Sequence, residues 1–477
     1  MSTGRPGLTR RRLLQGAAAA PLLAALPRAG LAASDGPIRE YRLRAAPASV
    51  RLAAPPFPPS ALWCYGGATP GPELRLRHGE RLRVVLENGL DELTAVHWHG
   101  VRVPNEMDGI SFLTQPPVEP GQQFVYEFEP PDAGTFWYHS HENAPVQQGR
   151  GLHGVIVVEE RDPPRVDRDL VWSLDDWRLD RDAQIVDDFD SALDYSRAGR
   201  IGNTVTLNGR TSPELPVRAG ERIRLRVVNS ANARIFQLRF QGHQPTVIAL
   251  DGQPVEPFQE PSLTLAPAQR ADLVIDMSGR PGERFAVIDT FYGQNPFRVA
   301  ELAYSEEPPL RESPLDAPIA LAPVALPEPV LDDRSLTKEV LLEGGDLGRL
   351  RKAYVDGRQR GLSELILDGK FWAVCGVAGF RQVMPPFITA ERGRTVVLRL
   401  LNRTAWPHTI HTHGHSFRIV SRHGREPDRA VWRDTVWLEP EEDTVVAFVA
   451  DNPGDWLLHC HMLSHAYAGM QATFRVT

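Results

Sequence analysis

The sequence has few cysteines, no excess of positive charge and no long hydrophobic run, and each shortage narrows the choice of function. Three cysteines leave at least one without a disulfide partner, and Cys460 has no cysteine near it, which disfavours a closed zinc site with paired thiolates. The 53 basic and 60 acidic residues give a formal net charge of -7, which argues against a nucleic-acid partner. The apolar stretch Ala17 to Leu26 is too short to span a membrane as a helix.

That apolar stretch belongs to a predicted export signal. It follows the run Thr9-Arg10-Arg11-Arg12-Leu13-Leu14-Gln15, and small residues end it near Ala32 and Ala33. This order indicates a twin-arginine signal peptide over residues 1–33, with the mature chain starting near Ser34. We therefore expect a periplasmic or secreted protein.

Three segments of similar sequence predict an all-β fold built from repeated copies. Each is a run of Val, Leu and Ile with alternating character, which predicts a strand closed by a turn. The arginines within them are expected to face solvent, and the 42 prolines and 39 glycines of the chain suit short strands joined by many turns. The segments are Gly79 to Asn88, Gly220 to Asn229 and Gly393 to Asn402.

A chain of 477 residues is too long for one hydrophobic core, and the repeat predicts three tandem domains. We expect a short helix or an irregular lid within Leu347 to Leu367, where the β pattern breaks. Cys64 and Cys375 fall in different domains, which leaves open whether they pair or stay as buried free thiols. The domains are placed at residues 34–163, 164–308 and 328–477, with an extended proline-rich linker at 309–327.

Histidine pairs occupy the same register in two of the three copies. His97 and His99 follow the first repeated segment as His411 and His413 follow the third, whereas the second copy has apolar residues there. Residues i and i+2 of a strand point to the same face, so each pair can reach two neighbouring metals. We expect the first and third copies to face each other, with the second copy as a spacer.

A second group of metal-ligand residues lies between His459 and Met470. Cys460 stands between two histidines, and His465 follows. With His408, the segment supplies two imidazoles, one thiolate and a weak thioether, which are the ligands of a trigonal copper site. On a strand the Cys460 side chain points opposite to those of its neighbours, so one strand can serve two metal sites.

Four motifs, in this order, resemble those of three-domain multicopper oxidases of the laccase-like, bacterial exported kind. The resemblance implies cupredoxin-like Greek-key β-sandwich domains and four copper ions. It also implies a copper-dependent oxidase that takes single electrons from phenols, aromatic amines or similar donors and reduces O2 to water by four electrons. The motifs are His97-Trp-His99-Gly, Trp137-Tyr-His139-Ser-His141, the run His408 to His413 and the run His459 to Met470.

The resemblance also assigns a ligand to each copper. The type 2 copper takes His97 and His411. The type 1 copper takes His408, Cys460 and His465, with Met470 as the axial ligand. The type 3 pair takes His99, His139, His141, His413, His459 and His461. The first copy has Thr94 and Ser140 where the third has His408 and Cys460, which restricts the type 1 site to the third copy.

Three residues are predicted to take part in catalysis. Cys460 would carry electrons towards its histidine neighbours. Asp108 matches an acidic position that the family keeps near its copper cluster, and Glu142 follows His141. Relatives often have a glutamate after the second type 1 histidine to assist proton supply, and this chain has Ala466 there, which Glu142 would compensate.

Two other functions stay open at this stage. A cuprous or other metal-ion oxidase serving copper tolerance is one, although such enzymes usually carry a methionine-rich insertion and this chain has six methionines, none of them between Gly345 and Phe371. A copper-free structural or cell-envelope protein on the same scaffold is the other, although its ligand set would be expected to be incomplete. The expected partners are O2 and a small electron donor, and we expect a monomer.

Overall fold

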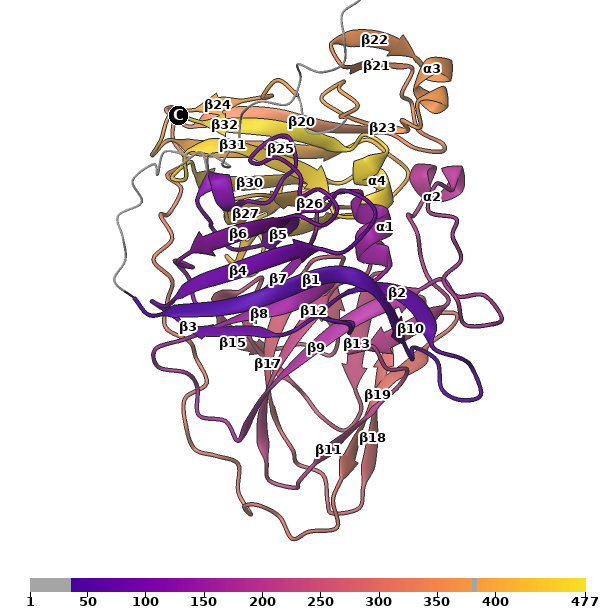
Figure 1. The fold of residues 1–477 in the computed structure, drawn as a ribbon. Coiled ribbons are helices and arrows are strands. Elements are labelled where there is room, and N and C mark those ends of the chain that lie inside the picture. Colours follow the sequence, from indigo (N-terminus) through magenta and orange to yellow (C-terminus); the bar gives the residue numbers. More distant parts are fainter. Residues whose placement is uncertain (1–35, 380–383) are drawn as a thin grey trace, which may run out of the picture. The chain divides into compact units, whose positions relative to one another are not determined.

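The computed structural model describes residues 36–379 and 384–477, and these residues are nearly all β-structure (Figure 1). The predicted signal peptide and the export route that rests on it lie outside the described residues. None of the helices in the described ranges is long and apolar enough to cross a membrane. The all-β prediction is confirmed.

The first β-sandwich pairs a sheet of order β2-β1-β4-β6 with a sheet of order β3-β8-β7-β5. Side chains from both sheets, among them Leu82, Trp98 and Tyr138, form one buried core. The strands are β1 (Ile38–Val50), β2 (Ser60–Tyr65), β3 (Leu74–Arg77), β4 (Arg81–Asn88), β5 (Val96–His99), β6 (Gln123–Phe128), β7 (Gly134–Ser140) and β8 (His153–Glu159), and the helices are η1 (Asn105–Met107) and α1 (Ala144–Gly149).

The second sandwich pairs the sheet β10-β9-β12-β17-β14-β15 with the sheet β11-β19-β18-β13-β16 around its own apolar core. Leu238 and Phe240 lie in that core, as their apolar character predicts. Its elements are β9 (Arg168–Trp177), α2 (Ala192–Ser196), β10 (Thr204–Leu207), β11 (Glu214–Val217), β12 (Arg222–Asn229), β13 (Phe236–Phe240), β14 (Thr246–Leu250), β15 (Gln253–Gln259), β16 (Leu263–Leu265), β17 (Arg270–Asp276), β18 (Arg284–Asp289) and β19 (Phe297–Tyr304).

The third sandwich pairs the sheet β23-β20-β25-β30-β27-β28 with the sheet β24-β32-β31-β26-β29. The segment Leu347 to Leu367, expected to contain a short helix or to form an irregular lid, folds as a two-stranded hairpin followed by one short helix. The elements are β20 (Leu336–Gly344), β21 (Lys352–Val355), β22 (Arg358–Gly361), α3 (Leu362–Leu367), β23 (Trp372–Val374), β24 (Thr389–Ala390), β25 (Thr395–Asn402), β26 (His408–Thr412), β27 (Phe417–Arg422), β28 (Trp432–Arg433), β29 (Thr435–Leu438), β30 (Asp443–Val449), β31 (Gly454–Cys460), α4 (Leu463–Tyr467) and β32 (Gln471–Val476).

The three repeated segments form β4, β12 and β25, and each ends on an asparagine with the same role. Asn88, Asn229 and Asn402 are buried, and each side-chain amide donates to two backbone carbonyls while its oxygen accepts a backbone N–H two residues on. An asparagine in this arrangement closes a turn by satisfying backbone groups that leave the ladder. The prediction of a strand closed by a turn is thus confirmed three times.

The arginines of these strands do not all face solvent as expected. Arg224 and Arg226 of β12 are fully buried, and both contact the buried carboxylate of Asp272. Buried guanidinium groups need such partners because an unpaired charge loses its hydration without compensation. In the second sandwich the arginines therefore form an internal ion-pair network.

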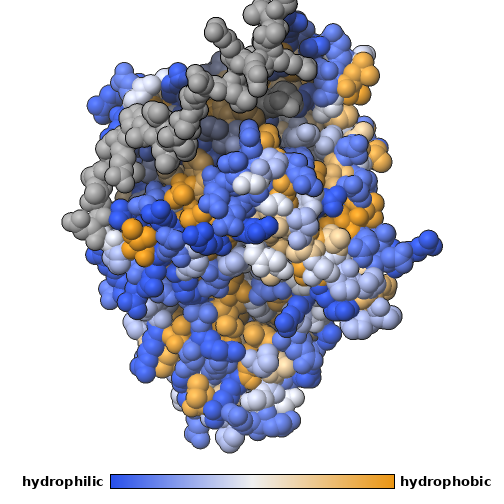
Figure 2. Space-filling view, viewed as in Figure 1, coloured by the Kyte–Doolittle hydropathy of each residue, from blue (hydrophilic) through white to orange (hydrophobic). Residues whose placement is uncertain are grey.

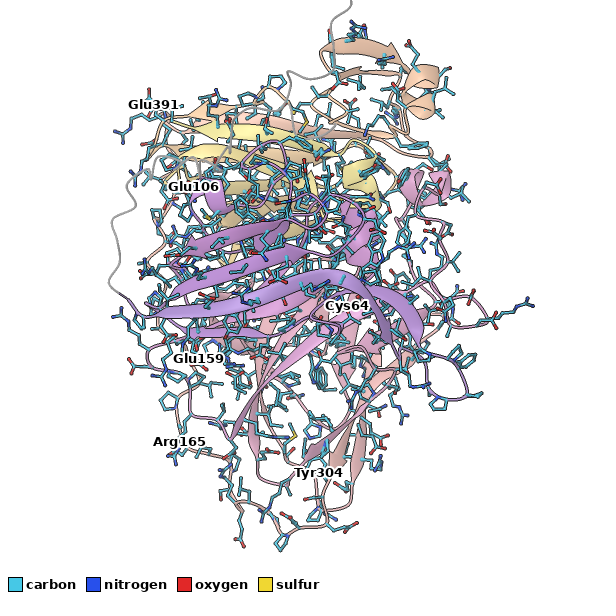
Figure 3. The ribbon with its side chains drawn as sticks, in the orientation of Figure 1. Cys64, Glu106, Glu159, Arg165, Tyr304 and Glu391 are labelled. Carbon is cyan, nitrogen blue, oxygen red and sulfur yellow. The ribbon has the colours of Figure 1, made fainter. Side chains whose placement is uncertain are left out.

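The cysteines do not form a disulfide. Cys64, Cys375 and Cys460 are all free, and Cys64 lies on β2 in the first sandwich (Figure 3). Cys64 is fully buried, and this burial raises the pKa of its thiol to about 12. It therefore behaves as a small apolar side chain.

Candidate metal centre

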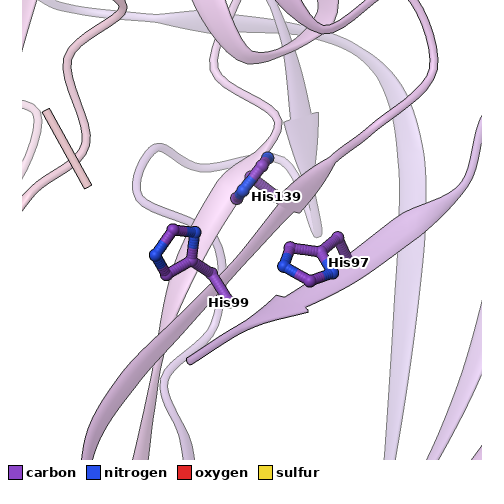
Figure 4. A group of neighbouring side chains, drawn as sticks. All are labelled: His97, His99 and His139. Carbon is purple, nitrogen blue, oxygen red and sulfur yellow. The ribbon is translucent and has the colours of Figure 1, made fainter. Parts of the chain in front are cut away.

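Four short strands carry most of the predicted metal ligands, and they pair two by two. β5 is antiparallel to β7, with His97 opposite His139, and β26 is antiparallel to β31, with His411 opposite His459. Alternate residues of these strands point to one face, so the ligands of each pair of strands collect on one side. In Figure 4 the imidazoles of His97, His99 and His139 lie around a common space.

The histidines of the first and third sandwiches meet in one buried cluster. His141 Nε2 lies 3.4 Å from His459 Nε2, and His461 Nε2 lies 3.3 Å from His139 Nε2. The rings of His97 and His413 stack, with centroids 3.9 Å apart. Donor atoms at these separations can share a metal ion. The eight clustered residues are His97, His99, His139, His141, His411, His413, His459 and His461, and all of them are buried.

The two histidines predicted to bind the type 2 copper have equivalent surroundings. His97 Nδ1 donates to the carbonyl oxygen of Asp108 at 2.9 Å, and His411 Nδ1 donates to that of Asp434 at 2.8 Å. Neither Nε2 atom has a hydrogen-bond partner within the part of the chain that the structure describes. A histidine whose outer nitrogen is bonded to the backbone presents its inner nitrogen in the form that binds metal. The donor set therefore fits a metal ion.

Each of these aspartates also holds a histidine of the other sandwich. Asp108 Oδ2 accepts from His413 Nδ1 at 2.9 Å, and Asp434 Oδ1 lies 3.2 Å from His99 Nε2. Both carboxylates are buried. Asp108 was predicted from the sequence, whereas Asp434 was not, because it belongs to no repeated motif. Its only mark in the sequence is that it is the one acidic residue in the run Val431 to Leu438.

The second sandwich supplies no histidine to this cluster, but it supplies a charge. Arg270 on β17 pairs with Asp434 through two contacts, Nη1 to Oδ1 at 2.8 Å and Nη2 to Oδ2 at 2.5 Å. Both side chains are buried, and the guanidinium holds the pKa of Asp434 below its usual range. All three sandwiches therefore contribute to the cluster.

Burial favours the neutral form of several clustered histidines. Desolvation lowers the pKa of His99, His139 and His141 well below the ordinary value, and that of His459 to about 3. The neighbouring imidazoles lower these pKa values further, because a second positive charge nearby would repel the first. Neutral imidazole is the form that binds transition metals.

A separate group of three donors lies inside the third sandwich. Cys460 Sγ lies 3.7 Å from the Nδ1 atoms of both His408 and His465, and those two nitrogens lie 3.0 Å apart. All three side chains are fully buried, and Met470 is buried in the same core. The Cys460 amide donates to the Met470 carbonyl oxygen at 3.0 Å, which joins the backbones of the two residues. Two imidazoles and one thiol, with a methionine in the same core, are the residue types of a type 1 copper site.

The equivalent place in the first sandwich is filled by a hydrogen-bonded network. Thr94 Oγ1 and Ser140 Oγ both donate to Gln147 Oε1, at 2.8 and 2.5 Å. Gln147 Nε2 in turn donates to Glu92 Oε1 at 2.6 Å. Hydroxyl and amide groups are poor ligands for copper, so this network occupies the position that metal ligands hold in the third sandwich.

Glu142 and Asp108 take different positions relative to the histidine cluster. Asp108 is buried against the rings, whereas Glu142 lines a cavity of about 140 Å³ together with His141, His459 and Ala466. The cavity reaches two cluster histidines. It is large enough for O2 or a few water molecules.

Comparisons with known proteins agree with this geometry. Multicopper oxidase family models match residues 51–163, 168–306 and 367–477. The chain is 30% identical to the multicopper oxidase MmcO of Mycobacterium tuberculosis, over 85% of this chain and 81% of that protein, and 30% identical to laccase-1 of Fomitopsis schrenkii, over 87% and 82%. It superposes on a multi-copper oxidase from Pseudomonas thermotolerans with a TM-score of 0.81 at 34% identity, covering 93% of this chain and all of that one.

The comparisons confirm the cupredoxin-like fold and the class of reaction predicted from the four histidine motifs. Together with the buried histidine cluster and the Cys460 group, they show that the chain belongs to the multicopper oxidase family, as a copper-dependent oxidoreductase that uses O2 as its electron acceptor.

Proposed function

We propose that this oxidase holds four copper ions and takes its electrons from phenols or similar aromatic donors. The observation that carries the proposal is the arrangement at the end of β31, where Cys460 faces His408 and His465 while its neighbours His459 and His461 belong to the eight-histidine cluster. One peptide segment thus joins two metal sites covalently. Copper bound at these sites would supply one-electron redox chemistry and reduction of O2 to water.

Each predicted ligand has a place in this proposal. His408, Cys460, His465 and Met470 hold the type 1 copper, and His97 and His411 hold the type 2 copper. The type 3 pair is held by His99, His139, His141, His413, His459 and His461. The unpartnered Nε2 atoms of His97 and His411 and the short contacts among the other rings support the assignment.

Two carboxylates have separate roles in the proposal. Asp108 orients His413 and His97, because it contacts the Nδ1 atoms of both rings, at 2.9 and 3.3 Å. Glu142 transfers protons at the cavity that reaches the cluster. It takes the role of the glutamate that relatives often carry at the position of Ala466. Reduction of O2 to water consumes protons, so a carboxyl group beside the cavity has a direct use.

The surface near the type 1 group favours an organic donor over a metal ion. Exposed apolar side chains gather on α2, on α3 and on the segment before β21, where Leu193 is 60%, Leu347 is 80% and Leu367 is 86% exposed. Figure 2 shows hydrophobic surface on the side where Figure 1 labels α2 and α3. Apolar patches of this kind suit aromatic molecules, whereas a metal ion needs carboxylate or sulfur ligands.

Metal-ion oxidation is the second candidate. The chain is 26% identical to a protein of Kluyveromyces lactis named iron transport multicopper oxidase FET3, over 85% of this chain and 71% of that protein. A copper-free structural protein is the weakest alternative, because the predicted ligand set is complete. Export of the folded chain to the periplasm or beyond is part of the proposal and rests on the twin-arginine motif, and the protein is proposed to be a monomer.

Copper loading followed by oxygen uptake tests the proposal. We expect an intense blue thiolate-to-copper absorption band and faster O2 uptake with a phenol than with cuprous or ferrous ion. A blue protein that responds only to metal ions would assign the enzyme to metal oxidation. A colourless protein after loading would leave only the structural alternative.

A further inference from the structure

The outward nitrogen of His465 is already bonded to the protein. His465 Nε2 donates to the carbonyl oxygen of Arg197 at 2.6 Å, and its ring is fully buried. Nδ1 of the same ring faces Cys460 and His408. The residue that closes the site, Arg197, comes from the second sandwich, directly after α2.

The other type 1 histidine is covered as well. His408 Nε2 lies 2.8 Å from Thr404 Oγ1, and the indole of Trp372 packs on both histidine rings, with ring centroids 4.9 and 4.5 Å away. Trp372 is itself fully buried. Within residues 36–379 and 384–477, neither imidazole therefore presents a nitrogen to solvent.

Residues 195–199, which we call the covering loop, lie directly against His465. A side chain at Gly199 would contact the Ala233 side chain at 2.7 Å and would lie 3.9 Å from His465 Nε2. The chain just before the loop is held firmly, because Arg178 binds both carboxylate oxygens of Asp194 at 2.7 and 2.9 Å.

Apart from the bond to His465, the tip of the covering loop is held by weaker contacts. Arg197 pairs with Asp346 at 2.9 Å, and the Asp346 amide donates to the Ser196 carbonyl oxygen at 2.7 Å. The Arg197 and Asp346 side chains are 50% and 39% exposed. An ion pair this exposed stabilises by about 0.2–1 kcal/mol, so the tip is the part most easily opened.

We propose that Arg197 and Asp346 determine which donors this enzyme oxidises, by holding the covering loop over His465. The inference rests on the proposed function, because it concerns phenolic donors. A phenol gives up one electron to the copper site and one proton to solvent and becomes a phenoxyl radical. Its oxygen can accept a hydrogen bond from His465 Nε2 only if it displaces the Arg197 carbonyl. Donors that need no such hydrogen bond react from outside the loop.

The test uses Asp346→Asn, which removes the ion pair and keeps the backbone bond. The matched control is Asp455→Asn, which removes the Arg475–Asp455 pair, where the side chains are 47% and 32% exposed and 2.6 Å apart. The first readout is carbethoxylation of His465 by diethyl pyrocarbonate, mapped by peptide mass spectrometry on the copper-free form of each variant, because bound copper would leave the ring without a nitrogen lone pair for the reagent. We expect roughly two- to fivefold more labelling in Asp346→Asn and no change in the control, since loss of up to about 1 kcal/mol changes a population by up to about fivefold.

The second readout compares 2,6-dimethoxyphenol with ferrocyanide, which has no hydroxyl to place on an imidazole. We expect kcat/KM for the phenol to rise by roughly the same two- to fivefold, mainly through KM, with ferrocyanide unchanged. Unchanged His465 labelling in Asp346→Asn, or an equal rise for both donors, would overturn the inference. Failure of the parent enzyme to oxidise any phenol would refute the proposed donor class instead. The labelling result would still show whether the Arg197–Asp346 ion pair holds the covering loop over His465.

Discussion

Replacing Asp434 by alanine should damage both the fold and the copper cluster, because this carboxylate contacts both Arg270 and His99. Its removal leaves the fully buried Arg270 guanidinium with only the carbonyls of Thr135 and Ala268 and the more distant Asp251 carboxylate, 3.7 Å away. Breaking a buried ion pair from one side costs about 3–5 kcal/mol. The same change removes one of the two groups that contact His99 Nε2, the other being Thr435 Oγ1 at 3.1 Å. Loss of such an outer partner lowers metal affinity by roughly 10–100-fold.

Urea unfolding of the copper-free protein measures the first effect, and elemental analysis of the copper-to-protein ratio measures the second. Asp272→Ala is the matched control, because Asp272 is equally buried and pairs with Arg224 at 2.6 Å but belongs to none of the metal-ligand groups of the described chain. Both variants should lose stability, and only Asp434→Ala should lose copper. A loss below about 1 kcal/mol, or full copper content in Asp434→Ala, would refute the reasoning.

Four further predictions follow from the two metal sites. Met470→Leu should raise the type 1 reduction potential, because a weak thioether ligand is removed, and a redox titration without an upward shift would contradict the assignment. Asp108→Asn should keep the blue band but lower O2 turnover, and full turnover would exclude its role. Burial lowers the pKa of His465 from 6.5 to about 4, so as pH falls the unfolded chain takes up this proton before the folded chain does. His465 alone should therefore remove roughly 3 kcal/mol from the unfolding free energy of the copper-free protein between pH 6.5 and about 4, and the other buried histidines add to the loss. An equal or higher urea midpoint at the lower pH would contradict that sign, and His465→Gln should flatten the decline. Gln147→Leu should lower the unfolding free energy by roughly 1–3 kcal/mol, because it leaves two buried hydroxyls without their acceptor, while the blue band stays intact.

The sequence alone was enough to predict the ligands, the repeat and the class of chemistry. Metal ligation by imidazole and thiolate needs particular residue types at strand spacing, so His97, His411 and Cys460 are visible without any coordinates. The three asparagine-terminated strands are local patterns as well, because each side chain bonds to backbone only a few residues away or to a neighbouring turn. The twin-arginine segment and the domain boundaries remain predictions from sequence.

Only the tertiary structure decided what surrounds those ligands. Asp434 and Arg270 are 164 residues apart along the chain, and Arg197 and His465 are 268 residues apart. No local sequence pattern predicts either contact. The buried arginines of β12 reversed a solvent-facing prediction, because their carboxylate partners come from other strands and from the link between sandwiches. Side chains carry their own chemistry in the sequence, but burial, charge partners and access to solvent are properties of the packed chain, and these control how the metal sites are oriented and which donors reach them.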